Sequence, residues 1–116
     1  MIWFNNFKVD WEIVWDCRVN LQSGTTYTLA LTDRSSIVSM NNASANTVTI
    51  PLNSSVAFPV GTTITIVQRG TGITTIQGTT GVSVNGTSAG SKATTGQYQG
   101  IAIYKESTDS WIALNK

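Results

Sequence analysis

The segment from Phe7 to Leu21 alternates between apolar and polar residues over fifteen positions, and this pattern restricts the possible folds more than any other feature of the sequence. Every odd position is apolar, and Val14 is the only apolar residue at an even position. An extended chain places successive side chains on opposite faces, whereas a helix would scatter these apolar residues over two faces. The pattern therefore predicts a strand. Because strands usually contain about 5–6 residues, the segment either bends between two sheets or is partly an arm on a neighbouring subunit.

The rest of the chain predicts short strands separated by turns. Thr, Ser and Asn (18, 12 and 9 residues) make up a third of the 116 residues, and charged residues only 11%. Branched and aromatic side chains favour a pleated sheet, and glycine, asparagine and proline punctuate it. The sequence predicts an all-β fold, a compact antiparallel β-sandwich or barrel of about nine short strands with an extended N-terminal strand or arm. It shows no fixed-period repeat of the kind that indicates a solenoid.

Several connections and a division into two parts follow from the turn residues. Residues 63–77 predict a hairpin with the four-residue loop Arg69-Gly70-Thr71-Gly72. Residues 85–91 predict a flexible, solvated loop, and residues 97–114 a closing hairpin. We expect residues 1–21 to be an extended strand or docking arm. Residues 22–116 are expected to form a single β-sandwich domain.

The composition excludes several classes of function. The chain has no histidine and one cysteine, so it holds no Ser-His-Asp triad, no histidine-ligated metal and no intrachain disulfide. A net charge of +1 gives no electrostatic footprint for nucleic acid. No apolar run is long enough to insert in a membrane, and no signal peptide is visible. We expect no enzyme, no cofactor and no metal site.

The ionisable residues of the alternating segment do not form a convincing chemical site. Asp10, Glu12 and Asp16 share its polar face, but alternate strand positions hold the first two about 7 Å apart and no further ligand is evident. A solvated strand face with Lys8 and Arg18 as cross-strand partners is the preferred interpretation.

Five aromatic residues near the N-terminus are candidates for docking or for an oligomer interface. They are Trp3, Phe4, Phe7, Trp11 and Trp15. Aromatic side chains are enriched among the residues that dominate binding energy, and termini stay mobile unless something holds them. For Trp11 and Trp15, burial in the domain core is an equally good interpretation.

Two neutral loops, residues 41–46 and 85–92, are candidates for touching a ligand. Asn41, Asn42 and Asn85 offer hydrogen-bonding groups, and Tyr98 offers an aromatic face. These loops would serve the alternative function, a receptor-binding module for a host surface glycan. The simpler interpretation is that loops are polar because their backbone faces water.

Three runs of sequence carry a resemblance to a known family. Ser23–Leu29 begins Ser-Gly-Thr-Thr, Met40–Pro51 contains Asn-Asn-Ala-Ser, and Asn53–Thr62 contains Ser-Ser-Val-Ala-Phe-Pro. With the pattern continuing to the C-terminus, residues 22–116 resemble the small all-β domain of bacteriophage tail fibre and other virion structural proteins. Residues 1–21 lie outside the resemblance.

The resemblance implies a phage structural module that is commonly oligomeric and has no catalytic motif. We therefore expect a non-enzymatic structural component of a tailed bacteriophage virion, a homotrimer that docks on other virion proteins. Its placement stays open between a small fibre or appendage on the tail and a decoration (cement) protein on the capsid. It would be made in the host bacterial cytoplasm and reside in the virion.

Overall fold

The computed structural model describes residues 18–115, which form a β structure with one short 3-10 turn, η1 (Leu31–Asp33). Eleven strands are present rather than about nine, and they confirm the all-β prediction. The strands are β1 (Val19–Gln22), β2 (Thr26–Thr28), β3 (Ile37–Met40), β4 (Asn46–Ile50), β5 (Thr63–Gln68), β6 (Thr74–Gly78), β7 (Ser83–Val84), β8 (Thr87–Ser88), β9 (Ser91–Ala93), β10 (Gly100–Ser107) and β11 (Ser110–Asn115).

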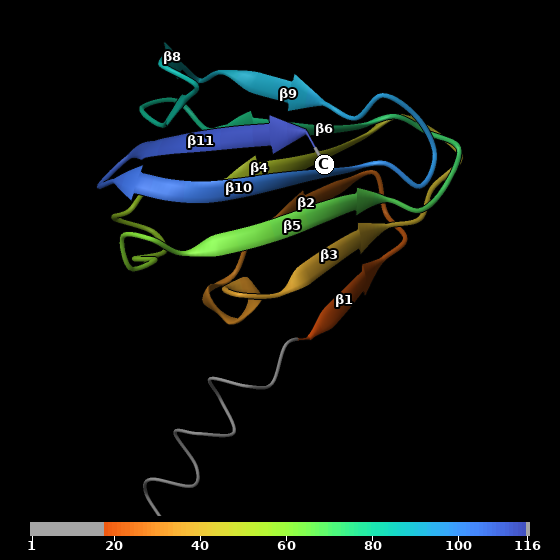
Figure 1. The fold of residues 1–116 in the computed structure, drawn as a ribbon, viewed down its shortest axis with the longest axis horizontal. Coiled ribbons are helices and arrows are strands. Elements are labelled where there is room, and N and C mark those ends of the chain that lie inside the picture. Colours follow the sequence, from red (N-terminus) through yellow and green to blue (C-terminus); the bar gives the residue numbers. More distant parts are fainter. Residues whose placement is uncertain (1–17, 116) are drawn as a thin grey trace, which may run out of the picture.

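Two sheets pack face to face in these residues, as expected for a sandwich (Figure 1). The larger has the order β1-β3-β5-β10-β11-β7-β8, and the smaller has the order β2-β4-β6-β9. The prediction of an antiparallel sandwich is wrong, since five of the nine strand pairings among the described residues are parallel. Consecutive strands β1 to β6 lie alternately in the two sheets, so neighbours within a sheet come from successive passes of the chain and run in the same direction.

These alternating strands form three coils of a short solenoid, made by β1–β2, β3–β4 and β5–β6. Val19, Ile37 and Thr65 occupy the same position in successive coils of the larger sheet, so 18 and then 28 residues separate equivalent positions. The unequal spacing comes from the connections outside the strands. It explains why the sequence shows no fixed period although the chain coils as a repeat architecture does.

The three coils cross between the sheets at the same end of the molecule, on the right in Figure 1. We call these crossings the arch loops; they are residues 23–25, 41–45 and 69–73. The predicted hairpin at residues 63–77 is therefore wrong, because β5 and β6 belong to different sheets. The turn residues were identified correctly, but glycines that permit a hairpin also permit an arch.

Glycines allow the second and third arch loops to stack in direct backbone contact. The Gly72 N–H donates to the Asn42 carbonyl at 2.9 Å, and the Gly70 N–H donates to the Met40 carbonyl at 3.1 Å. A Cβ at Gly72 would lie 2.0 Å from the Ser44 carbonyl oxygen, and one at Gly70 would lie 2.6 Å from the Asn42 nitrogen. No side chain fits in either place, so glycine sets the distance between coils.

A buried polar network lies under the arch loops. Its members Asn46, Gln68, Thr74 and Thr94 are each at most 5% exposed. The Thr74 hydroxyl donates to Asn46 Oδ1 at 2.6 Å, the Thr94 hydroxyl donates to Gln68 Oε1, and Gln68 Nε2 donates to the Gly70 carbonyl at 3.1 Å. In residues 18–115 no buried side-chain nitrogen or oxygen lacks a partner. Since an unpaired buried polar group costs about 1–3 kcal/mol, this network fixes how the strands enter and leave the arches.

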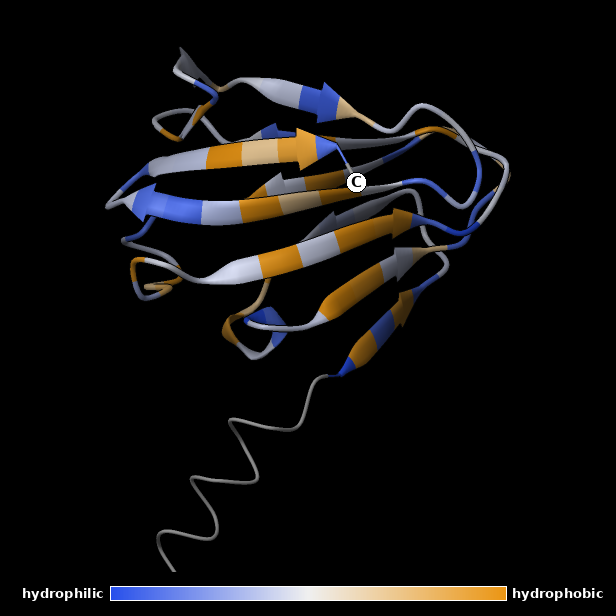
Figure 2. Cartoon of the chain, in the orientation of Figure 1, coloured by the Kyte–Doolittle hydropathy of each residue, from blue (hydrophilic) through white to orange (hydrophobic). Residues whose placement is uncertain are grey.

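The apolar core lies between the two sheets, and hydrophobic residues alternate with polar ones along several strands (Figure 2). Burial of such side chains contributes about 1.5–3 kcal/mol each for the larger ones, and Phe58 packs edge-on against Trp111 with ring centroids 5.6 Å apart. The buried apolar residues are Leu29, Val38, Met40, Val48, Ile50, Phe58, Ile64, Ile66, Ile76, Val82, Val84, Ile101, Ile103, Trp111 and Ala113.

The β10–β11 hairpin in the larger sheet and β9 in the smaller sheet run antiparallel to the last coil and close the side of the solenoid away from β1 and β2. The predicted closing hairpin is confirmed: β10 pairs with β5 on one side and with β11 on the other. The predicted flexible loop at residues 85–91 instead contains the turn between β7 and β8, in which Asn85 and Gly86 both have positive φ. Asn-Gly is the residue pair that such two-residue turns prefer.

We predict that Gly72→Ala destabilises the fold, because its methyl group would collide with the Ser44 carbonyl of the arch below. The free energy of unfolding should fall by about 1–3 kcal/mol, the usual cost of overpacking. Gly96→Ala is the matched control, since a Cβ there meets nothing within 4 Å. Urea denaturation measures both; equal stability of the two variants would contradict the stacking argument.

Candidate interaction surface

β1 carries apolar side chains on its outer side and polar ones on its inner side. Val19 is 58% exposed and Leu21 is 76% exposed, whereas Asn20 and Gln22 align with the core residues Val38 and Met40 and face the interior. Within β1 the expected arrangement of the alternating segment is thus reversed, since Val19 and Leu21 face outward and Asn20 and Gln22 face the space between the sheets. Arg18, just before β1, is exposed, and the polar residues from Lys8 to Asp16 lie outside the described residues.

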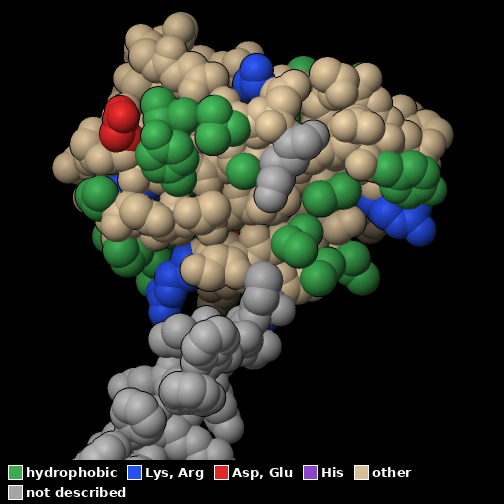
Figure 3. Space-filling view, in the orientation of Figure 1, with side chains coloured by type: hydrophobic (Ala, Val, Ile, Leu, Met, Phe, Trp, Pro, Cys, Tyr) green, Lys and Arg blue, Asp and Glu red, His purple; other side chains and the backbone are tan. Residues whose placement is uncertain are grey.

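The outward residues of β1 continue into an uncharged surface across the larger sheet. Register aligns Val19 with Ile37, Thr65, Ala102 and Leu114 on successive strands. The neighbouring rows are Leu21, Ser39, Val67 and Gly100, and Thr63, Tyr104 and Ile112. We call these three rows the outer face. Figure 3 looks onto it: the charged side chains of the described residues lie around its rim, and hydrophobic ones are spread across it.

The outer surface of the smaller sheet differs, because it is lined with hydroxyls. Thr26, Thr47 and Thr75 form one row across β2, β4 and β6, and Thr28, Thr49 and Gln77 form the next. Such side chains hydrogen-bond to water on a solvated sheet face. The two sheets thus present unlike surfaces, and only that of the larger sheet would gain from being covered.

β1 also exposes backbone hydrogen-bonding groups. In residues 18–115 it has one neighbour, β3, to which the carbonyls of Arg18 and Gln22 are bonded through the N–H groups of Ile37 and Asn41, both at 2.8 Å. Backbone groups of successive strand residues point to opposite edges, so those of Val19 and Leu21 face away from β3. An edge of this kind is a template for another strand.

A polar network fills the interior of the first coil. The Tyr27 hydroxyl donates to Asp33 Oδ2 at 2.5 Å, and Asn20 Nδ2 lies 2.8 Å from the Tyr27 oxygen and 2.9 Å from Asp33 Oδ1. Gln22 Nε2 donates to Asn20 Oδ1 at 2.9 Å. Burial raises the pKa of Tyr27 to about 12, and its hydrogen bond to Asp33 and the charge of that carboxylate act in the same direction.

The four predicted loop residues are used in different ways. Asn42 Nδ2 donates to the Ser23 carbonyl at 2.8 Å, and Asn85 Oδ1 accepts the Ala113 N–H at 2.8 Å, so both side chains hold backbone in place. Asn41 is exposed in the second arch loop. Tyr98, which has a φ of 65°, is 66% exposed.

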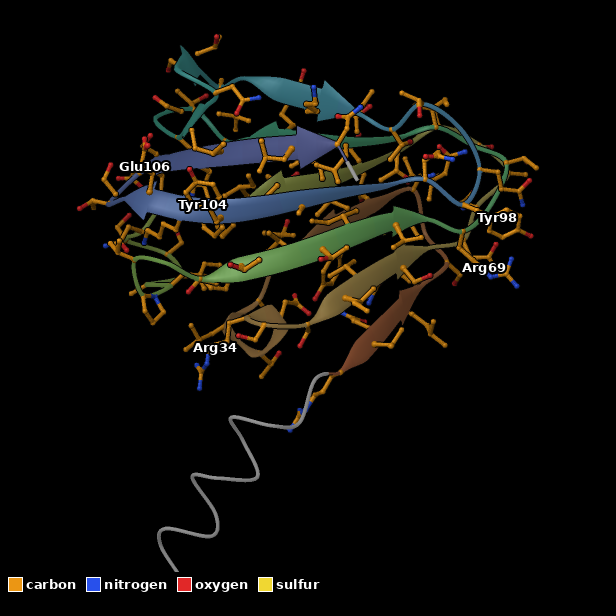
Figure 4. All side chains as sticks on the ribbon, in the orientation of Figure 1. Arg34, Arg69, Tyr98, Tyr104 and Glu106 are labelled. Atoms are coloured by element: carbon orange, nitrogen blue, oxygen red, sulfur yellow. The ribbon has the colours of Figure 1, made fainter. Side chains whose placement is uncertain are left out.

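Sequence reasoning missed the partner of Tyr98. The Arg69 guanidinium lies 5.5 Å from the centroid of the Tyr98 ring, and the two residues sit at the arch-loop end (Figure 4). Asn85 lies away from them, on the turn that leads from β7 to β8. The structure therefore brings together Tyr98, Arg69 and the arch loops, but not Asn85.

The outer face was also missed, although the sequence contains a signal for it. Trp111-Ile112-Ala113-Leu114 is an unbroken apolar run, and such a run in a strand indicates that neither face is strongly polar. The predicted docking residues Trp3, Phe4, Phe7, Trp11 and Trp15 lie outside the described residues.

Two buried ionisable residues have structural roles. Asp33 accepts hydrogen bonds within the first coil, as described above, and also from the Ala30 N–H at 2.8 Å. Lys105, 2% exposed, donates to Asn53 Oδ1 at 2.5 Å and to the Phe58 carbonyl at 2.7 Å, and so anchors the loop between β4 and β5.

No group of three or more metal-binding side chains occurs within residues 18–115. No helix in that range has the length and apolar character needed to span a membrane.

Comparison with models of known protein families and with curated proteins found no match. The resemblance of residues 22–116 to phage virion modules therefore rests on the sequence runs that carry it.

The raised pKa of Tyr27 predicts a loss of stability at high pH. The folded state keeps the Tyr27 proton up to about pH 12, whereas the unfolded chain releases it near the ordinary pKa of 10.0. Stability from this group is complete below pH 10.0 and is lost as pH rises toward 12. Tyr27→Phe should flatten this decline. Denaturation midpoints measured across the window test it, and parallel curves for the two proteins would contradict the assignment.

Proposed function

We propose that this chain is a non-enzymatic structural component of a tailed bacteriophage virion. It assembles as a homotrimer and docks on other virion proteins, as a small fibre or appendage or as a capsid decoration (cement) protein. It is made in the host bacterial cytoplasm and resides in the particle. The observation that carries the proposal is the uncharged outer face, which ends at the open edge of β1.

The outer face supports assembly because it combines two features of protein–protein interfaces. The centres of such interfaces are depleted in charged residues and contain aromatic and aliphatic side chains, here Tyr104, Ile112 and Leu114 among others. The edge of β1 that has no neighbour among residues 18–115 offers main-chain hydrogen bonds beside the same surface. Covering both at once removes an apolar surface and an aggregation-prone edge from water.

The phage assignment is supported by the resemblance of residues 22–116, which also implies the oligomeric state. Capsid and tail placements differ in copy number, since a decoration protein covers the whole shell whereas a tail appendage is present in few copies. Quantitative mass spectrometry and electron microscopy of purified particles distinguish the two. Absence of the protein from purified particles would refute the virion assignment.

A second candidate function is recognition of a host surface glycan at the arch-loop end. The specific observation in its favour is the exposed Tyr98 ring beside Arg69. Strained backbone conformations such as the positive φ of Tyr98 cluster at ligand-binding positions. An aromatic face and a guanidinium together suit a sugar ring that bears an acidic group. This site lies at the arch-loop end of the molecule, next to the row of the outer face that includes Gly100.

The first prediction from the proposed assembly concerns Leu114, which is 52% exposed on the outer face. Leu114→Lys places an ammonium group at an apolar contact and should weaken self-association by about tenfold or more. Val60→Lys is the matched control, because Val60 is 65% exposed in a loop outside the outer face. Analytical ultracentrifugation gives the oligomeric state, and recovery of each variant in particles gives incorporation. Unchanged association of the Leu114 variant would contradict the use of this surface.

The glycan alternative makes a separate prediction. Tyr98→Ala should weaken binding of the purified protein to acidic host glycans by about tenfold, the loss expected for an aromatic contact that dominates a small site. Leu31→Ala, an exposed apolar residue of η1, serves as the control. Glycan-array binding and competition with phage adsorption are the measurements. If adsorption is unhindered at saturating protein, the alternative fails.

A further inference from the structure

The open edge of β1 has three properties that together specify what can bind to it. Its outward backbone groups are those of Val19 and Leu21, its outer side chains are apolar, and its inner side chains, Asn20 and Gln22, are polar. A strand added there must therefore be apolar on its outer face and polar on its inner face. A strand that is apolar on its inner face would bring that face against the amides of the first coil.

Residues 7–17 of the chain have this alternation. Their odd positions are apolar, and their even positions, Val14 excepted, are polar or charged. The segment precedes β1 directly, and its alternation continues in phase through Val19 and Leu21. Placed beside β1 with the same faces, it would extend the outer face by apolar side chains and add polar ones next to Asn20 and Gln22.

The segment cannot easily return to the β1 of its own chain. A tight hairpin favours a turn pair such as Asn-Gly or Asp-Gly, and residues 11–17 contain Asp16 but no glycine, proline or asparagine. A parallel return would need a crossover of a dozen or more residues. β3 of the same chain offers no partner either. It begins at Ile37, which lies opposite Val19, so β3 does not extend alongside residues 7–17. Within the larger sheet, these constraints favour a partner strand from another chain over residues 7–17 of the same chain.

We propose that residues 7–17 of a second copy of this chain add as a strand along the open edge of β1. This inference deepens the self-association in the proposed function and rests on it. The added strand pairs with the outward backbone groups of Val19 and Leu21. Its apolar side chains, Trp11 and Trp15 among them, enlarge the surface that is covered in the oligomer.

Cysteine cross-linking of the full-length chain tests this pairing. In a Cys17→Ser background, one protein carries Leu21→Cys, and a second carries a single cysteine at one odd position (9, 11, 13 or 15). Residues opposite each other on one face of paired strands have Cβ atoms about 4.5–5.5 Å apart, and the closer, non-hydrogen-bonded pairs reach the spacing of about 4.5 Å that a disulfide allows. We expect oxidation of the mixture to link the two proteins at one or two odd positions. Glu12→Cys is the control, since in the proposed strand its side chain would lie on the opposite face and should give no link.

Two results would overturn the inference. One is an oligomer that gives no link between the two proteins at any odd position. The other is linkage of Leu21→Cys only to itself, which would show that the edges of two β1 strands pair with each other. The virion assignment is tested separately: linked protein that is absent from particles refutes only that assignment, and incorporated protein without links refutes only the strand pairing.

A proline substitution provides a second test that does not depend on disulfide formation. Val19→Pro removes the outward N–H at the first position of an edge strand, where proline is tolerated because no bond to β3 is lost. Val19→Thr keeps the shape and the N–H and is the matched control. The proline variant should associate about tenfold more weakly than the threonine variant at unchanged thermal stability. Equal association of the two would count against strand addition.

Discussion

Close stacking of the arch loops is the constraint on which the rest of the structure depends. Gly70 and Gly72 lie against the backbone of the preceding arch, so the coils are held at sheet spacing where the chain changes direction. The amides and hydroxyls beneath them satisfy one another, and Gln68 ties its own strand to the Gly70 carbonyl. Parallel pairing of short strands then needs no long crossover, because each coil supplies two strands, one to each sheet. The apolar core follows from this arrangement, since alternate residues of every coil point between the sheets.

The two ends of the stack of coils differ in structure. At one end β10 and β9 run antiparallel to the last coil and complete both sheets. At the other, β1 and β2 have a neighbour on one side only among the described residues. The interior of that first coil is polar, with Asn20 and Tyr27 bonded to Asp33 where the next coil has Val38 and Val48. Polar side chains are stable at this end because water reaches it, and terminal repeats of solenoids are commonly modified in this way. The same end therefore has a polar interior and, among residues 18–115, a β1 edge without a neighbouring strand.

The composition and the local alternation predicted the class of fold and many strand positions, because these depend on neighbouring residues. They did not predict which strands share a sheet. Gly70 and Gly72 suit a hairpin and an arch equally well, and only their contact with Asn42 and Ser44, distant in sequence, decides between the two. Alternation also fails to say which face is buried: Val19 and Leu21 were expected to oppose a solvated polar face, yet they point outward because the first coil buries its amides. Of the candidate ligand residues, Tyr98 is exposed, but its contact with Arg69 depends on tertiary structure.

Symmetry limits what the open edge and the outer face can build together. A strand donated by one copy to the edge of the next is a heterologous contact, since donor and acceptor surfaces differ, and such contacts grow into filaments unless they close into a ring. Two copies that exchange strands with each other form a closed dimer. One-way donation around a threefold axis forms the next larger closed ring, and this is the arrangement that the proposed homotrimer requires. In such a ring every copy gives one strand and receives one, so every β1 edge is covered. The donated strands then enlarge the outer face of each copy. These enlarged faces can be covered by contacts among the copies or by contacts with the particle.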